Sequence, residues 1–222
     1  LDILAGRLGA DSRLFSLDDL EAIARNLEGV SVLLNAAGPF MNTAKPLMSA
    51  AIRAGVHYLD FSAELDTYSQ ALALDGQARA AGVMLLPGSG GSVAMLGSLA
   101  GHAVARVGNP RMISIALKVA GGMSRGSVTS ASQNITTETL HLVGGELVAR
   151  SPEEVRDFDF GEGPLSSFPV TLPDLVTLHQ ATGVRDIETF VHVAAGAFPD
   201  GDANELPAGP SSDERAANRY HA

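Results

Sequence analysis

Short apolar runs and longer amphipathic stretches alternate through the first half of the chain. The run Val30–Asn35 leads into two alanines, a Gly-Pro pair and Phe40, which is typical of a buried parallel strand that ends in a loop. Val56–Phe61 and Val83–Leu86 have the same character and predict two more strands. We also expect strands over Leu1–Ala5 and Arg13–Leu17.

Amphipathic stretches between these runs predict helices. Asp18 or Asp19 is suited to cap a helix that runs to Asn26, and Asn42 or Thr43 is suited to cap the next one. Gly55 ends this second helix, and Pro46 is expected in its first turn. Two further helices are predicted, over Asp66–Ala81 and Val93–Val107. Regular alternation of strand and helix with short loops predicts an α/β fold with a parallel, doubly wound sheet.

The pattern changes after Asn109–Pro110, where we place a domain boundary. The expected domains are residues 1–109 and residues 110–222, the second being a smaller α+β domain. Within it we expect a strand over Met112–Ala120, a helix over Ser127–Val143 and a strand over Thr189–Ala194. Loops between these elements are favoured by Pro152, Pro164, Pro169 and Pro173.

Composition excludes several function classes. A net charge of −10 without a basic cluster argues against binding to nucleic acid or to anionic membranes. The absence of cysteine excludes disulfides, thiol catalysis and cysteine-ligated zinc, and it is compatible with the cytoplasm. The six histidines are scattered without metal-ligand spacing, so no metal is expected. No apolar run approaches the length of a membrane span.

Candidate functional residues stand at the expected carboxyl ends of strands, where ligands bind in open α/β sheets. Arg7 follows the first strand and is suited to the 2′-phosphate of NADP. The loop from Asn35 to Phe40 is suited to lie over an adenosine. Asp60 and Glu64 follow the next strand and are either proton-transfer groups or caps of the helix that begins near Asp66.

Two glycine motifs need separate interpretation. Gly88–Ser89–Gly90–Gly91 follows a strand, but Val93 occupies the last glycine position of a dinucleotide fingerprint, so we interpret it as a tight turn. Gly122–Met123–Ser124–Arg125–Gly126 matches the G-x-S-x-G pattern of serine hydrolases. The acids and histidines that could complete a triad come later in the chain: Asp157, Asp174, Asp186, His179 and His192. A hydrolase built on Ser124 is therefore an alternative, although no oxyanion segment of the HGGG type is present.

Several segments together resemble the saccharopine dehydrogenase-like NADP-binding oxidoreductases, which include trans-acting enoyl reductase-like members. The most specific are Asn35–Ala36–Ala37–Gly38–Pro39–Phe40 and Gly55–Val56–His57–Tyr58–Leu59–Asp60. The others are Leu4–Ala5–Gly6–Arg7, Glu64, Leu85–Leu86–Pro87–Gly88 and Gly122–Met123–Ser124–Arg125–Gly126. The segments occur in the family's order.

The resemblance implies a Rossmann domain followed by an α+β domain whose sheet often serves dimerisation, so a homodimer is expected. It implies NADP as cofactor, held by Gly6, Arg7, Asn35, Ala36, Ala37, Gly38, Pro39 and Phe40. Asp60, Glu64 and Ser124 are then candidates near the transferred hydride. The expected reaction is hydride transfer to a carbonyl, an imine or an activated C=C bond of a small-molecule or acyl-chain substrate.

The family's glycine-rich loop would precede Leu1, and its closing elements would follow Ala222, so the chain is expected to be truncated at both ends. Pyrophosphate would then lack its usual helix N-terminus. A dinucleotide-binding module without catalysis is a third possibility beside the oxidoreductase and the hydrolase.

Overall fold

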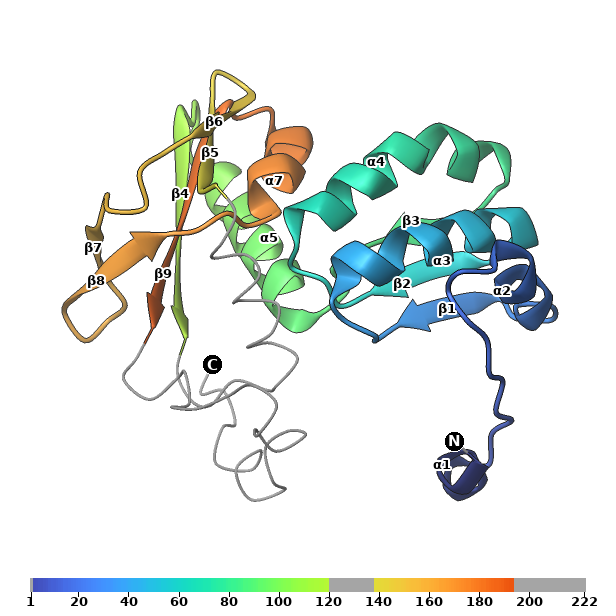
Figure 1. The fold of residues 1–222 in the computed structure, drawn as a ribbon. Helices are drawn as coiled ribbons and strands as arrows, with labels where there is room; N and C mark the ends of the chain where they lie inside the picture. The colour runs from blue at the N-terminus through green and yellow to red at the C-terminus, as the bar shows by residue number, and fades with distance from the viewer. Residues whose placement is uncertain (1, 120–137, 194–222) are drawn as a thin grey trace. The chain divides into compact units, whose positions relative to one another are not determined.

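The computed structural model describes residues 2–119 and 138–193. The chain divides into two compact units (Figure 1). The first comprises residues 1–62 and 66–90, and the second comprises residues 63–65 and 91–222. The division falls at Gly90–Gly91, so the helix that follows belongs to the second unit, whereas the sequence pattern placed the boundary after it, at Asn109–Pro110.

The first unit contains a three-stranded parallel sheet in the order β1-β2-β3. Its strands are β1 (Val32–Asn35), β2 (His57–Asp60) and β3 (Leu85–Leu86). Its helices are α1 (Asp2–Leu8), α2 (Leu20–Asn26), α3 (Phe40–Ala54) and α4 (Leu65–Ala80), the first residue of α4 being counted with the second unit. The alternation of strand and helix from β1 to β3 confirms the predicted parallel α/β fold.

Apolar spacing places α3 against the sheet and α2 against α3. Ala44, Leu47, Met48 and Ala51 recur at helical spacing on α3 and are buried, because this face packs against the strands. The resulting core includes Tyr58 of β2. Burial of this continuous cluster is the main source of stability for such a unit.

The ends of α2 and α3 follow local signals with one exception. Asp19 caps α2 as expected, since its Oδ1 accepts from the backbone N–H groups of Glu21 and Ala22 at 3.0 and 2.9 Å. Gly55 ends α3 in the left-handed conformation, which glycine adopts without steric cost. The N-cap of α3 is Pro39 and not Asn42 or Thr43, so Pro46 lies inside the helix and not in its first turn.

Two expected strands at the start of the chain are wrong. Residues 2–8 form α1, which buries none of its side chains. A strand without a neighbour leaves its backbone groups unpaired, whereas a helix pairs them internally. Arg13–Leu17 forms no strand either, and here Phe15 and Leu17 pack as single side chains against the core.

The second unit is built on a six-stranded sheet with two helices. Its strands are β4 (Met112–Val119), β5 (Leu140–Val143), β6 (Glu146–Ala149), β7 (Arg156–Asp159), β8 (Pro164–Pro169) and β9 (Asp186–Val193). The helices are α5 (Gly91–Val104) and α7 (Asp174–Thr182). Strand β9 pairs in parallel with β4 and antiparallel with both β5 and β8, so it is the central strand.

Hairpins replace the helix and loops expected in the middle of this unit. The described end of the predicted helix over Ser127–Val143 is strand β5, which turns through Gly144 and Gly145 into β6. Both glycines have positive φ, as a two-residue hairpin turn requires. Pro164 and Pro169 stand at the first and last positions of β8, where a missing N–H is tolerated.

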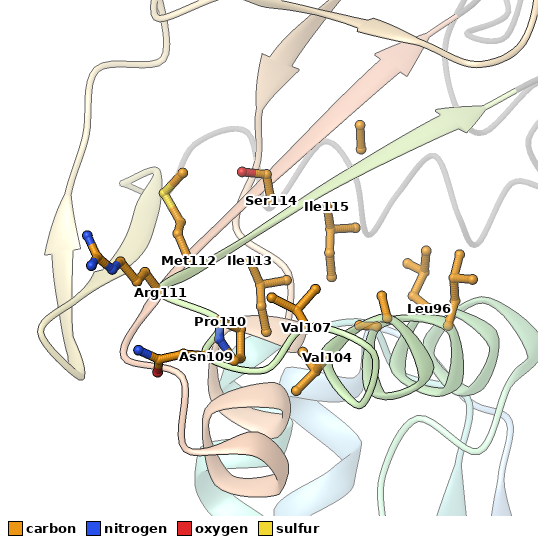
Figure 2. Close-up of a pocket in the computed structure, with 14 residues that line it drawn as sticks. Leu96, Val104, Val107, Asn109, Pro110, Arg111, Met112, Ile113, Ser114 and Ile115 are labelled. Atoms are coloured by element: carbon orange, nitrogen blue, oxygen red, sulfur yellow. The ribbon is translucent and has the colours of Figure 1, made fainter.

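One face of the second sheet packs on α5 and α7 through a core that includes Ile113, Ile187 and Leu175. Between α5 and β4 runs an apolar groove of about 510 Å³ (Figure 2). No helix among the described residues is long and apolar enough to cross a membrane.

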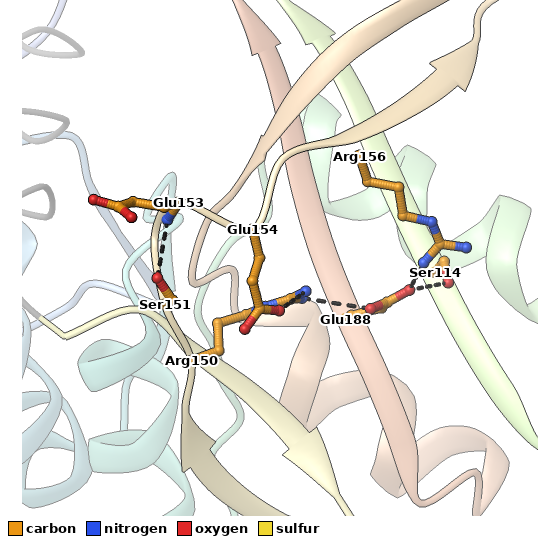
Figure 3. A network of polar contacts seen from close by, with 7 residues as sticks. All are labelled: Ser114, Arg150, Ser151, Glu153, Glu154, Arg156 and Glu188. Carbon is orange, nitrogen blue, oxygen red and sulfur yellow. Dashed lines mark hydrogen bonds and ion pairs between the residues drawn. The ribbon is translucent and has the colours of Figure 1, made fainter.

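A charged network lies on the second sheet (Figure 3). Glu188 of β9 accepts from Ser114 Oγ at 2.6 Å and from Arg150 at 3.4 Å, and it also pairs with Arg156. The Arg150 side chain is 8 % exposed, lies 4.8 Å from the centre of the Phe190 ring, and pairs with Glu154 as well. Oppositely charged groups thus compensate one another where water is largely excluded.

Candidate functional site

The carboxyl ends of β1 and β2 lie side by side in the first unit. Asn35 and Asp60 are direct neighbours in the parallel register. The alternation of strands and helices predicts that their loops share one edge of the sheet, and for these two residues the strand register confirms it. This edge is where ligands bind in parallel sheets.

Asn35 holds the loop that follows β1, residues 36–39, which we call the β1 loop. Its side-chain oxygen accepts from Ala37 N at 3.0 Å, and its amide nitrogen donates to Thr43 Oγ1 at 3.0 Å and to the Tyr58 hydroxyl at 3.1 Å. Thr43 in turn donates to the carbonyl oxygen of Ala37 at 2.7 Å. With 3 % of its surface exposed, Asn35 acts on the shape of the loop from within.

Tyr58 connects Asn35 to Asp60. Its hydroxyl donates to Asp60 Oδ2 at 2.8 Å, and neither residue has exposed surface. Burial raises the pKa of the Tyr58 phenol, the hydrogen bond from Asn35 opposes this shift, and the Asp60 charge adds to it. The phenol therefore stays protonated and serves as a fixed donor.

Asp60 fastens the loop after β3, residues 87–90, which we call the β3 loop. Asp60 Oδ1 accepts from Gly88 N at 2.8 Å and from Ser62 N at 2.9 Å, and its carbonyl accepts from Ser89 N at 2.8 Å. A carboxylate that accepts several N–H groups is well compensated in a buried place. Asp60 is thus bonded to the β3 loop and to Ser62, not to the first turn of α4.

The β1 loop presents small side chains to solvent. Ala36, Ala37 and Gly38 are exposed, whereas Pro39 and Phe40 are half-buried at the start of α3. Small residues on a rigid loop allow a flat group to approach the backbone closely. The first turn of α3 carries no acidic residue, so the positive end of its dipole is not offset there.

Gly6 and Arg7 lie elsewhere than expected. Both belong to the exposed helix α1 and not to the end of a sheet strand. Among the described residues, Arg7 makes no hydrogen bond or ion pair that would orient it toward the β1 loop. Its proposed part in cofactor selection remains a prediction from the sequence.

The remaining catalytic candidates are Glu64 and Ser124. Glu64 is buried and falls in the short segment that clusters with the second unit. Ser124, with its G-x-S-x-G motif, lies outside the described residues. His179 and His192 each use Nδ1 on a backbone carbonyl, of Val184 and of Ser166, and not on a carboxylate. In a catalytic triad a carboxylate accepts from Nδ1 of the histidine and orients the ring, and neither His179 nor His192 has this arrangement.

Three members of the site were missed from the sequence. Tyr58 was given no role of its own, Thr43 was expected to cap a helix, and Gly88 was expected to form part of a turn. The signal for Tyr58 was its place two residues before Asp60, because residues i and i+2 of a strand share one face. Within residues 2–119 and 138–193, no three acidic or histidine side chains gather as a metal site.

Comparison with known proteins finds a similarity within the first unit. Residues 4–86 match the family model described as the saccharopine dehydrogenase NADP binding domain. No curated protein sequence matches the chain.

Solved structures are similar in fold. Apo saccharopine dehydrogenase (L-Glu forming) from Saccharomyces cerevisiae matches with a TM-score of 0.55 and 12% identity, over 86% of this chain and 46% of that one. An oxidoreductase from Pseudomonas syringae matches with a TM-score of 0.42 and 17% identity, over 88% of this chain and 54% of that one. The chain thus spans about half the length of these structures. From Leu4 to Leu86 the chain is similar to the saccharopine dehydrogenase NADP binding domain.

Proposed function

We propose that this protein is an NADP(H)-dependent oxidoreductase, and that the β1 loop supports the adenosine half of the cofactor. The observation that carries the proposal is the pairing of exposed Ala36, Ala37 and Gly38 with a buried network that fixes their backbone. A preformed platform lowers the ordering cost of binding. The similarity of residues 4–86 to an NADP binding domain supports the choice of ligand.

The residues present fit this cofactor in part. The β1 loop and the amino end of α3 suit a planar base and a nearby anion. Arg7 remains the proposed partner of the 2′-phosphate. The cofactor supplies the hydride when bound. In this proposal Asn35, Tyr58 and Asp60 position the two loops. A small-molecule or acyl-chain substrate with a carbonyl, imine or activated C=C group is reduced beside them.

The proposal is tested by titrating the chain with NADPH and with NADH, followed by cofactor fluorescence. Ala36→Glu puts a carboxylate on the exposed platform, and we expect it to weaken NADPH binding at least tenfold. Ala73→Glu is the matched control, because Ala73 is exposed on α4 and belongs to neither loop. Equal effects of the two variants, or no binding of either dinucleotide, would reject the platform.

Arg7 has a test of its own. Arg7→Ala should weaken NADPH binding by about 1–3 kcal/mol, the scale of a hydrogen bond to a charged group, and leave NADH binding unchanged.

Turnover is then sought with carbonyl, imine and enoyl substrates. Tight NADPH binding without turnover favours the non-catalytic module, and labelling of Ser124 by a fluorophosphonate favours the hydrolase.

A further inference from the structure

The groove between α5 and β4 in the second unit has one polar end and one apolar end. Asn109 and Arg111 lie at one end and Leu96 lies at the other (Figure 2). Its α5 side is a stripe at helical spacing, formed by Leu96, Leu99, Ala100, Ala103 and Val104, and Val107 continues the stripe just after the helix ends. Nothing in the proposed cofactor site uses these residues.

This stripe is apolar although much of it faces water. Leu99 is 66 % exposed and Val107 is 53 % exposed, whereas Ala100 is buried in the core. Contiguous exposed apolar surface in a concave place marks a binding site more often than scattered apolar residues do. The volume of about 510 Å³ lies within the ordinary range of roughly 300–1,000 Å³ for small-ligand pockets.

Charge at the polar end selects the sign of a ligand. Arg111 is the one charged residue of the lining, all of whose members are described, and none of them is acidic. Arg111 is exposed and makes no ion pair with another described residue. On a chain of net charge −10, such an unpaired cation favours an anionic group at this end of the groove.

We propose that the α5–β4 groove binds a single-chain amphiphile with a carboxylate head group, a fatty acid in chemical class. The hydrocarbon tail lies along the α5 stripe and covers Leu99 and Val107, and the carboxylate meets Arg111. From Leu96 to Val104 the helix advances about 12 Å at 1.5 Å per residue, which gives an extended tail room along its length. The tail supplies affinity through burial, and Arg111 supplies the choice of charge.

The test uses the full chain and three probes below their micelle concentrations: dodecanoate, dodecanol and dodecyltrimethylammonium, each measured by titration calorimetry. We expect dodecanoate to bind most tightly. Octanoate and decanoate should bind more weakly, by up to about fifteenfold for each pair of methylenes removed. Binding that is not saturable, or that does not depend on chain length, would overturn the proposal.

Charge reversal locates the head group. Arg111→Glu should weaken dodecanoate binding about tenfold and leave the affinity for dodecanol within twofold of the parent value. Dodecyltrimethylammonium should then bind more tightly than dodecanoate. Arg79→Glu makes the same charge change on the exposed surface of α4 in the first unit and should alter none of the three affinities beyond twofold. Equal responses to the two variants would mean that net charge, and not the groove, decides binding.

Blocking the tail locates the groove itself. Leu99→Glu should abolish dodecanoate binding, and Val107→Glu is a second variant at another exposed position of the stripe. Both positions face water, so the urea midpoint should remain near that of the parent chain. Undiminished dodecanoate binding in both variants would reject this location.

Sedimentation tests whether a second copy of the chain occupies the groove instead. If the chain is a dimer that Leu99→Glu converts to a monomer, and no fatty acid binds, the groove is a dimer interface and the proposal is rejected.

Discussion

The Tyr58 hydroxyl donates a 2.8 Å hydrogen bond to the carboxylate of Asp60, and both residues are completely buried. Tyr58→Phe removes this donor and leaves a buried carboxylate oxygen with one partner fewer. We expect the free energy of unfolding to fall by about 1.5–3 kcal/mol, the scale of a hydrogen bond to a charged group. Urea denaturation measures the change. Ser16→Ala, which removes an exposed hydroxyl, should cost less than about 0.5 kcal/mol, and a similar cost in both variants would contradict the role given to Tyr58.

Gly88 has no room for a side chain. A Cβ at this position would lie 1.5 Å from the Tyr68 hydroxyl oxygen and 3.0 Å from the Ser62 carbonyl oxygen, and φ is +66°. Gly88→Ala should therefore destabilise the protein by about 3 kcal/mol or more, since both the clash and the backbone oppose it. Gly76→Ala on α4 meets open space and should stabilise by up to about 1 kcal/mol. Thermal unfolding of the two variants should shift in opposite directions.

Asp174, at the start of α7, has 1 % of its surface exposed, and its Oδ1 atom has no hydrogen-bond partner. Burial raises its pKa to about 6, against a small opposing effect from its own backbone N–H. Because the folded state then holds the proton more tightly than the unfolded state, this residue's contribution to stability is greatest below about pH 4. It is lost as the pH rises to about 6, by roughly 3 kcal/mol in total.

Asp174→Asn removes this titration. The difference in unfolding free energy between the variant and the parent chain should move in favour of the variant between about pH 4 and pH 6, and then stay constant. Urea midpoints measured across this range give the difference directly. The same difference at every pH would show that Asp174 is ionised at its ordinary pKa in the folded protein.

Glu188 is the centre of the charged network on the second sheet, with Ser114, Arg150 and Arg156 around it. Glu188→Gln leaves the nearly buried Arg150 without one of its two carboxylates, and we expect a loss of about 2–4 kcal/mol. Glu154→Gln is the matched control at the other end of the same arginine. Its side chain is 54 % exposed, so its loss should stay below about 1 kcal/mol. Equal losses would contradict the importance of burial.

The first unit could be predicted from sequence where strand and helix alternate locally. Residues from Asp19 to Leu86 contain caps, stops and apolar runs that lie next to the elements they define, and helices α2, α3 and α4 follow them closely. The start of the chain could not be predicted in this way. Leu1–Ala5 is apolar like a strand, but a strand also needs a neighbouring strand for its backbone hydrogen bonds. The sequence of the segment alone does not show whether such a neighbour is present.

In the second unit the prolines were a misleading signal. They favoured loops, yet Pro164 and Pro169 are the first and last residues of strand β8. The Gly144–Gly145 pair was a recognisable hairpin signal between two short runs, and the helical interpretation of the preceding residues outweighed it. Pairing between distant strands leaves little trace in the sequence of either one.

For the candidate site, the location could be predicted but the roles of its residues could not. The location at the ends of β1 and β2 follows from the order of elements, and the register between Asn35 and Asp60 confirms it. The roles of these residues could not be predicted, because they depend on burial. Asn35 was expected in a loop over the cofactor, and Asp60 was expected to transfer protons or to cap a helix. Both side chains are buried and hold loops.

The central position of β9 has a consequence for synthesis on the ribosome. Its parallel partner β4 is made early, and the contact between Ser114 and Glu188 joins residues 74 positions apart. Until Asp186–Val193 has emerged, the strands made before it have no central strand to join. The first unit needs only neighbouring segments, so it can fold while the second waits. During that interval β4 has an unpaired edge, which makes this part of the nascent chain prone to aggregation until β9 joins it.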